Sequence, residues 1–174
     1  PESGLVYHAV GVNGAATKSF LRSENFIEQG KYVTPDLVIF GLGINDAYKP
    51  DNAWFPEEYG ARYDTLVDWF REINPECEFI FMTNNDSYYR RRIPNEHGLD
   101  VVEQMKLLSK RHDAALWDLF GVMGGLNSVA IWEENRLAKS DKIHFTNAGY
   151  RLNSDLLFWA LWEEYEKHLK ALGQ

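Results

Sequence analysis

Four residues that could together perform acyl transfer are spread along this 174-residue chain. Asp141 precedes His144 by three residues, so the acid could orient an imidazole that accepts a proton. Gly14 and Asn45 lie in glycine-rich turns that follow apolar runs, where a backbone N–H and a side-chain amide could stabilise an oxyanion. Together with a serine nucleophile, these groups would form the machinery of acyl transfer.

Each motif also has a purely structural interpretation. Asp141 could be a surface charge and His144 a capped loop histidine. Considered by itself, an acid three residues before a histidine favours this structural interpretation. The Gly11-Val12-Asn13-Gly14 turn could need glycine only for its backbone geometry. Asn45 could cap its own backbone in an Asx-turn. The positions of these turns in the fold decide between the two interpretations.

Apolar runs alternate with helical patterns along the whole chain. This order predicts an α/β fold with a parallel sheet and helices on both faces, in which ligands bind beyond the carboxyl ends of the strands. The turns at residues 11–15, 41–46 and 83–89 and the Asp141–His144 loop are therefore expected to converge at one sheet edge. The expected strands are residues 5–10, 37–40, 79–82 and 115–118, and the expected longer helices are residues 16–29, 56–73, 99–112 and 148–171. The last helix is expected to bury Leu152, Leu156, Trp159 and Trp162.

Composition limits the classes of function. The length fits one domain over residues 1–174, and the net charge of −8 argues against a nucleic-acid partner. No apolar stretch is long enough to span a bilayer, and the single Cys77 excludes an internal disulfide framework. No residues have metal-ligand spacing and no phosphate-binding loop is present, so no metal or cofactor is expected.

Three blocks of the sequence, in this order, resemble the SGNH (GDSL-type) hydrolases. They are Gly11-Val12-Asn13-Gly14, Gly43-Ile44-Asn45-Asp46 and Asp141-Lys142-Ile143-His144. The resemblance implies a three-layer α/β/α, flavodoxin-like fold and a serine esterase, most typically one that deacetylates carbohydrates outside the cytoplasm, secreted or periplasmic. It also implies that His144 is the general base, Asp141 its orienting acid, and Gly14 and Asn45 the oxyanion-hole donors.

Three further residues are predicted to contact substrate. Asn13 lies in the first glycine turn, Asn84 follows the third apolar run, and Tyr88 begins the Tyr88-Tyr89-Arg90-Arg91-Arg92 loop. In that loop the tyrosines could stack on sugar rings or the arginines could meet an anionic group. The loop could equally be a solvated basic segment.

The first block of this family, a Gly-Asp-Ser that carries the nucleophile, is absent from the sequence. We expect the chain to begin after the first strand of the fold, so that a preceding segment supplies both that strand and the serine. In the flavodoxin-like order this strand lies between residues 5–10 and 37–40. Direct pairing of those two runs would contradict the expectation. The alternative is a non-catalytic carbohydrate-binding module that lacks the nucleophile.

Overall fold

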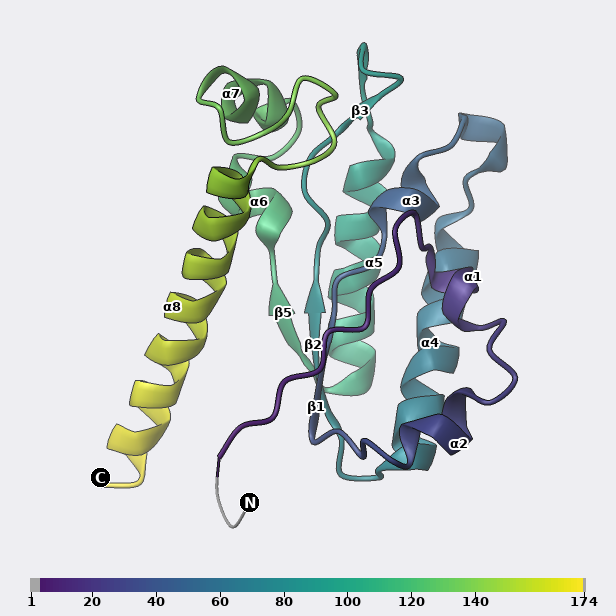
Figure 1. The fold of residues 1–174 in the computed structure, drawn as a ribbon, viewed down its shortest axis with the longest axis vertical. Coiled ribbons are helices and arrows are strands. Elements are labelled where there is room, and N and C mark those ends of the chain that lie inside the picture. The colour runs from purple at the N-terminus through teal and green to yellow at the C-terminus, as the bar shows by residue number, and fades with distance from the viewer. Residues whose placement is uncertain (1–3, 174) are drawn as a thin grey trace.

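Three parallel strands form the sheet in the computed structural model, which describes residues 4–173. Strand β1 (Leu37–Phe40) pairs with β2 (Glu78–Met82), and β2 pairs with β5 (Ala115–Trp117). The strand order is therefore β1-β2-β5, with all three strands running in the same direction (Figure 1). The α/β class with a parallel sheet, predicted from the alternation of strand and helix patterns, is confirmed.

Helices follow each strand. Pro56 at the first position of α4, with Glu57 and Glu58 in its first turn, starts that helix as the sequence predicts, and Asn74 ends it. No helix in the described part of the chain is long and apolar enough to cross a membrane. The helices are α1 (Thr17–Phe20), α2 (Phe26–Gly30), α3 (Ile44–Ala47), the 3₁₀ turn η1 (Asp51–Ala53), α4 (Pro56–Ile73), α5 (His97–His112), α6 (Leu119–Met123), α7 (Ser128–Glu134) and α8 (Asn147–Ala171).

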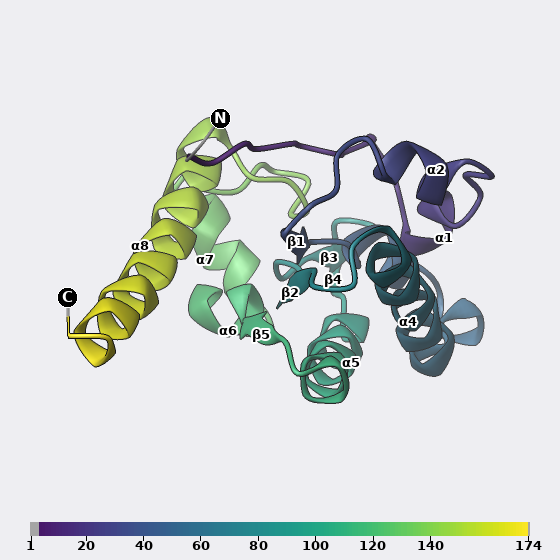
Figure 2. The same cartoon turned by 90° about the horizontal axis from the view of Figure 1, so that it is seen from below.

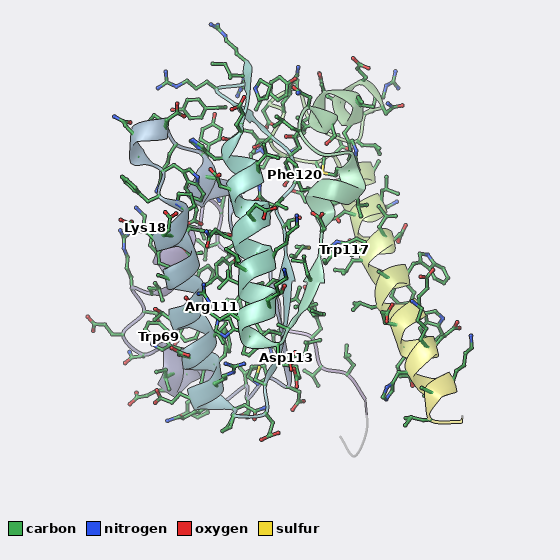
Figure 3. The ribbon with its side chains drawn as sticks, turned by 180° about the vertical axis from the view of Figure 1, so that it is seen from behind. Lys18, Trp69, Arg111, Asp113, Trp117 and Phe120 are labelled. Carbon is green, nitrogen blue, oxygen red and sulfur yellow. The ribbon has the colours of Figure 1, made fainter. Side chains whose placement is uncertain are left out.

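The main core lies between the sheet and the helices α4 and α5. The ring of Phe40 on β1 lies 5.2 Å from that of Tyr63 on α4 and 5.5 Å from that of Phe81 on β2. Aromatic packing of this kind stabilises the layer beyond its buried area. The two helices are also tied at the surface, where Arg111 of α5 forms an ion pair with Asp64 of α4. Figure 3 shows this face, with Arg111 beside α4.

Residues 5–10 do not form the predicted strand. Leu5 is 90% exposed and Val10 76% exposed, and no strand within residues 4–173 pairs with them. A strand needs the N–H and C=O groups of a neighbour, which explains why the apolar pattern alone was insufficient. Residues 5–10 also do not pair with β1, in which Leu37 is 48% and Ile39 40% exposed on one face of the sheet. The direct pairing that would contradict an intervening strand is therefore not observed.

Two helix predictions need correction. The expected helix over residues 16–29 is split into α1 and α2, because Ser19 and the Ser23–Asn25 turn satisfy the backbone locally. The apolar side chains of α8 are not buried as predicted: Trp159 is 59% and Trp162 43% exposed. Figures 1 and 2 show α8 on the opposite side of the sheet from α4, standing apart from it. An amphipathic helix buries its apolar face only where a second layer meets it, and the described residues do not supply that layer. The same correction covers Leu152 and Leu156, of which the first is exposed and the second half-buried.

A short hairpin that the sequence did not predict projects from the end of β2. Strand β3 (Tyr88–Tyr89) pairs antiparallel with β4 (Ile93–Pro94). Its turn contains Arg90 and Arg91 with φ angles of 51° and 63°, in the left-handed region that Asn and Gly normally occupy. The hairpin lies at the same end of the sheet as α3 and α7 (Figure 1).

Candidate active site

A pocket of about 460 Å³ lies where the loops at the carboxyl ends of the strands meet. Its lining includes Asn13 and Gly14 from the first turn, Asn45 from α3, and Asp141 and His144 from the loop before α8. These segments are far apart in the sequence and come together at the upper end of the sheet in Figure 1. The convergence expected from a parallel sheet is thus what the structure shows, although the catalytic roles of these residues stay predictions.

Asp141 and His144 form a close pair. Nδ1 of His144 lies 2.9 Å from Oδ2 of Asp141. An ionised carboxylate can only accept hydrogen bonds, so Nδ1 carries the proton and Nε2 is left as an acceptor. Nε2 makes no hydrogen bond to any described residue, and the His144 side chain is 53% exposed at the pocket. The geometry is that of an imidazole oriented to remove a proton from a group in the pocket.

The backbone of this loop folds around the Asp141 carboxylate. Oδ1 accepts hydrogen bonds from the backbone N–H groups of Ile143 at 2.9 Å and His144 at 3.0 Å. Lys142, between them, takes a φ of 55°, which turns the chain back on itself. Burial alone would raise the pKa of Asp141, but the hydrogen bonds from His144 and Ile143 outweigh it and lower that pKa below its ordinary value. Asp141 therefore stays ionised at neutral pH.

Other segments hold the loop in place from both sides. Asn85, after β2, donates from Nδ2 to the carbonyl of Ile143 at 2.9 Å, and the backbone N–H of Tyr88 donates to the carbonyl of Lys142 at 2.9 Å. Thr146 caps α8 by accepting a hydrogen bond from the Gly149 N–H. A Cβ atom on Gly149 would lie 2.0 Å from the Leu137 carbonyl oxygen, so the helix start approaches the loop as only glycine allows.

The two predicted oxyanion donors are tied to each other. Gly14 has a φ of 74° in a turn closed by the hydrogen bond from Ala15 N–H to the Val12 carbonyl. Asn45 donates from Nδ2 to the carbonyl of Ala15 at 2.9 Å. One of its two amide hydrogens is thus used to fix the turn, and the other is available to a ligand. This contact excludes an Asx-turn on its own backbone as the sole role of Asn45.

Asp46 fixes α3 against α1 beneath these donors. The residue is 1% exposed, and its carboxylate accepts hydrogen bonds from both the backbone N–H and the hydroxyl of Thr17, at 2.9 and 2.6 Å. The side chain of Arg62 on α4 donates to the same hydroxyl at 2.8 Å. Because Asn45 and Asp46 are adjacent, this buried network sets the position of the Asn45 amide.

The three predicted substrate-contacting residues differ in position. Asn13 lines the pocket. Asn84 is buried and donates to the carbonyl of Asn85, and it is the neighbouring Asn85 that lines the pocket. The Tyr88 hydroxyl lies 3.2 Å from Oδ1 of Asn127, and the Lys142 ammonium lies 4.5 Å from the Tyr88 ring, so Tyr88 packs behind the loop. Sequence reasoning missed Asn85 because two adjacent asparagines follow β2 and nothing in the pattern indicates which one faces the pocket.

A larger pocket, of about 700 Å³, lies beside the first turn of α5. It contains His97, but both ring nitrogens face acceptors: Nδ1 lies 3.0 Å from the Ala47 carbonyl and Nε2 lies 3.1 Å from Oδ1 of Asp51. His97 therefore has no free nitrogen to act as a base. Among residues 4–173, no group of three or more His, Cys, Asp or Glu side chains is arranged to hold a metal ion.

Comparison with protein families gives a match over most of the chain. The family model described as the GDSL-like lipase/acylhydrolase family matches residues 2–152. No curated protein matches the sequence significantly.

Several solved structures share the fold. A structure of a peptidoglycan O-acetylesterase has a TM-score of 0.80 at 20% identity, over 88% of this chain and 45% of that one. An acetyl xylan esterase has a TM-score of 0.62 at 18% identity, over 87% and 78% of the two chains. A lipase/acylhydrolase from Enterococcus faecalis has a TM-score of 0.60 at 23% identity, over 83% and 69%. The chain thus spans somewhat less than half the length of the first of these proteins.

Proposed function

This chain belongs to the GDSL-like lipase/acylhydrolase family, and on that premise we propose that it is the base- and oxyanion-bearing part of a serine esterase that deacetylates carbohydrate esters. The observation that carries the proposal is the His144–Asp141 pair, joined at 2.9 Å, in one pocket with Gly14 and Asn45. A positioned base and two oxyanion donors are the groups that acyl transfer to serine requires.

The mechanism follows from the orientation of the imidazole. Nε2 of His144 removes the proton from the serine hydroxyl as the serine oxygen attacks the ester carbonyl. The negative charge that develops on the carbonyl oxygen is met by the Gly14 N–H and the free amide hydrogen of Asn45. His144 then gives its proton to the sugar oxygen as the C–O bond breaks. A water molecule hydrolyses the acyl-enzyme by the same two steps, with His144 again acting first as base and then as acid.

We assign the serine to a segment outside the described residues. Within residues 4–173, no Ser, Thr or Cys lines the pocket. The outer edge of β1 has no partner strand there, and the exposed side chains of Leu37 and Ile39 flank it. Open strand edges with apolar side chains favour the addition of another strand. One further strand beside β1 would cover this edge, and its carboxyl end would reach the pocket, which is where the nucleophile is needed.

Acylated carbohydrate is the proposed substrate. The support comes from the names of two structural neighbours, a peptidoglycan O-acetylesterase and an acetyl xylan esterase. Both names describe acetyl esters of polysaccharides. The pocket lining fits this class, because the Asn13 side chain and the Asn85 side-chain oxygen are available to sugar hydroxyls, while both N–H donors of the Asn85 amide bind backbone carbonyls.

A second candidate is a carbohydrate-binding module without catalysis, which the lack of a pocket serine in residues 4–173 favours. Two measurements on the full-length protein separate the candidates: hydrolysis of p-nitrophenyl acetate and labelling by a serine-reactive phosphonate. The esterase predicts both turnover and labelling. Glycan binding without either result would support the module and contradict the esterase.

A further inference from the structure

The β3–β4 hairpin brings a cation into the proposed active-site pocket. Arg91 is the one Lys or Arg among the residues that line it. Within residues 4–173, its guanidinium makes no ion pair and no hydrogen bond. An arginine that lines a binding pocket without a protein partner has five N–H groups available to a ligand.

The hairpin fixes the backbone of the turn that carries the exposed Arg91 side chain. The turn is closed by the hydrogen bond from Arg92 N–H to the Tyr89 carbonyl at 3.2 Å. The Arg90 N–H donates to the Tyr48 hydroxyl at 2.8 Å, and the rings of Tyr48 and Tyr89 lie 5.0 Å apart. Tyr48 itself lines the pocket, so the hairpin is anchored directly to the pocket wall.

The residue types in this turn are also unusual for its backbone conformation. Arg90 and Arg91 both adopt positive φ angles, of 51° and 63°, where glycine or asparagine would be less strained. Positive φ at both central residues is the geometry of a type I′ hairpin turn, so the hairpin itself explains these angles, and non-glycine residues held in this way are found at ligand-binding sites.

Two other cations near the pocket, Arg90 and Lys142, are engaged by aromatic rings. The Arg90 guanidinium lies 5.2 Å from the Tyr89 ring centre and the Lys142 ammonium 4.5 Å from that of Tyr88, both as cation–π pairs. The Asp141 carboxylate is occupied by His144 and two backbone N–H groups. Asp141 keeps its negative charge but its oxygens already have hydrogen-bond partners, so Arg91 is, within the described residues, the one cation in the pocket lining whose N–H donors are unused.

We propose that Arg91 binds a carboxylate of the substrate, so that the enzyme acts on acyl esters of acidic sugars in preference to neutral ones. This inference rests on the proposed esterase function and names its substrate class. The planar guanidinium matches a carboxylate through two parallel N–H···O bonds, which gives it both charge and directional selectivity.

The test compares two acetylated sugars that differ in one group, an O-acetyl methyl glucuronide and the matching O-acetyl methyl glucoside. In the full-length wild-type protein, kcat/KM is expected to be at least about tenfold higher for the glucuronide, and this preference should shrink as salt is raised. Arg91→Ala is expected to bring the ratio close to one, mainly through KM, while Arg91→Lys retains an intermediate ratio. Arg92→Ala, in the same turn but outside the pocket lining, is the matched control and should keep the wild-type ratio.

Equal kcat/KM for both sugars in the wild type, or a ratio that Arg91→Ala leaves unchanged, overturns the proposal. The second result would mean that Arg91 contacts protein rather than substrate. Calorimetry can measure the binding of the two deacetylated glycosides without any turnover. The wild type is expected to bind the glucuronide more tightly than the glucoside, and Arg91→Ala is expected to lose this difference in affinity. Hydrolysis of p-nitrophenyl acetate reports separately on the esterase function, so failure of either proposal is recognised by itself.

Discussion

Replacing Asp141 by asparagine separates the chemical role of this residue from its structural one. The asparagine side chain would keep an oxygen to accept the N–H groups of Ile143 and His144, which lie at 2.9 and 3.0 Å. It would present an NH₂ group to Nδ1 of His144 in place of the carboxylate oxygen at 2.9 Å. Nδ1 would then have to accept, and the proton would move to Nε2, where it blocks the base.

The expected loss follows from this change of tautomer. The same substitution in a serine protease triad lowers kcat about 10⁴-fold, equivalent to about 5.4 kcal/mol of activation free energy. The free energy of unfolding should change by less than about 1 kcal/mol, because the loop keeps its two backbone hydrogen bonds. Asp141→Ala removes all three contacts, so it should lower both the activity and, by about 1.5 kcal/mol or more, the stability.

The assay is hydrolysis of p-nitrophenyl acetate by the full-length protein, with urea unfolding followed by circular dichroism. Asp155→Asn is the control, since Asp155 is exposed on α8 and makes no hydrogen bond from its side chain within the described residues. If Asp141→Asn keeps more than a tenth of the wild-type kcat while remaining folded, Asp141 does not set the tautomer of His144 and the reasoning is refuted.

Three further predictions concern groups around the site and in the core. Asn45→Ala should lower kcat by about 10²–10³-fold, or about 2.7–4 kcal/mol of activation free energy, because it removes an oxyanion donor and the 2.9 Å contact to the Ala15 carbonyl. A loss of kcat below about fivefold would exclude Asn45 as an oxyanion donor. Burial raises the pKa of Asp86, against the opposing hydrogen bond from Val129, so the folded state binds a proton more readily than the unfolded state. The free energy of unfolding of the wild type, relative to that of Asp86→Asn, should therefore fall as pH rises through that pKa. Urea unfolding of both proteins at about pH 8 and at the lowest pH at which they remain folded measures this difference. A difference that is the same at both pH values would contradict the prediction. Burial, with the charges of Asp36 and Glu78, raises the pKa of Cys77 to about 11, so only about one thiol in a thousand is ionised at pH 8. Because the thiolate is the reactive form, iodoacetamide should label the folded protein slowly, and complete labelling within minutes would contradict this prediction.

The sequence was informative wherever one short segment determines its own conformation. Pro56 with its acidic first turn starts α4, and the apolar runs at 37–40 and 79–82 form parallel strands that pair with each other. Parallel connectivity then places the Asn45 turn at the carboxyl end of β1, and the hydrogen bond from Asn45 to the Ala15 carbonyl holds the Gly14 turn beside it. The position of the Asn45 turn could be predicted because it depends on chain order more than on side-chain detail.

Features that depend on a partner or on tertiary contacts could not be inferred from the pattern. Residues 5–10 have a strand-like sequence but no neighbour to pair with within residues 4–173, and Trp159 on α8 has no layer there to cover it. Arg91 lines the pocket on a hairpin whose Arg90 N–H donates to the hydroxyl of Tyr48, more than forty residues earlier, a contact that the sequence pattern does not reveal. Asp46 was visible in its motif, but its burial against Thr17 depends on the packing of α1, which the sequence pattern assigned to a single longer helix.

The central claim is that residues 4–173 supply the base and the oxyanion donors, while the nucleophilic serine comes from outside them. The most direct measurement treats the full-length protein with a fluorophosphonate and locates the labelled serine by mass spectrometry, for the wild type and for His144→Ala. We expect one label, on a serine outside residues 4–173, and a large loss of labelling rate in His144→Ala. A label on any serine within these residues, or an unchanged rate in the variant, would contradict it.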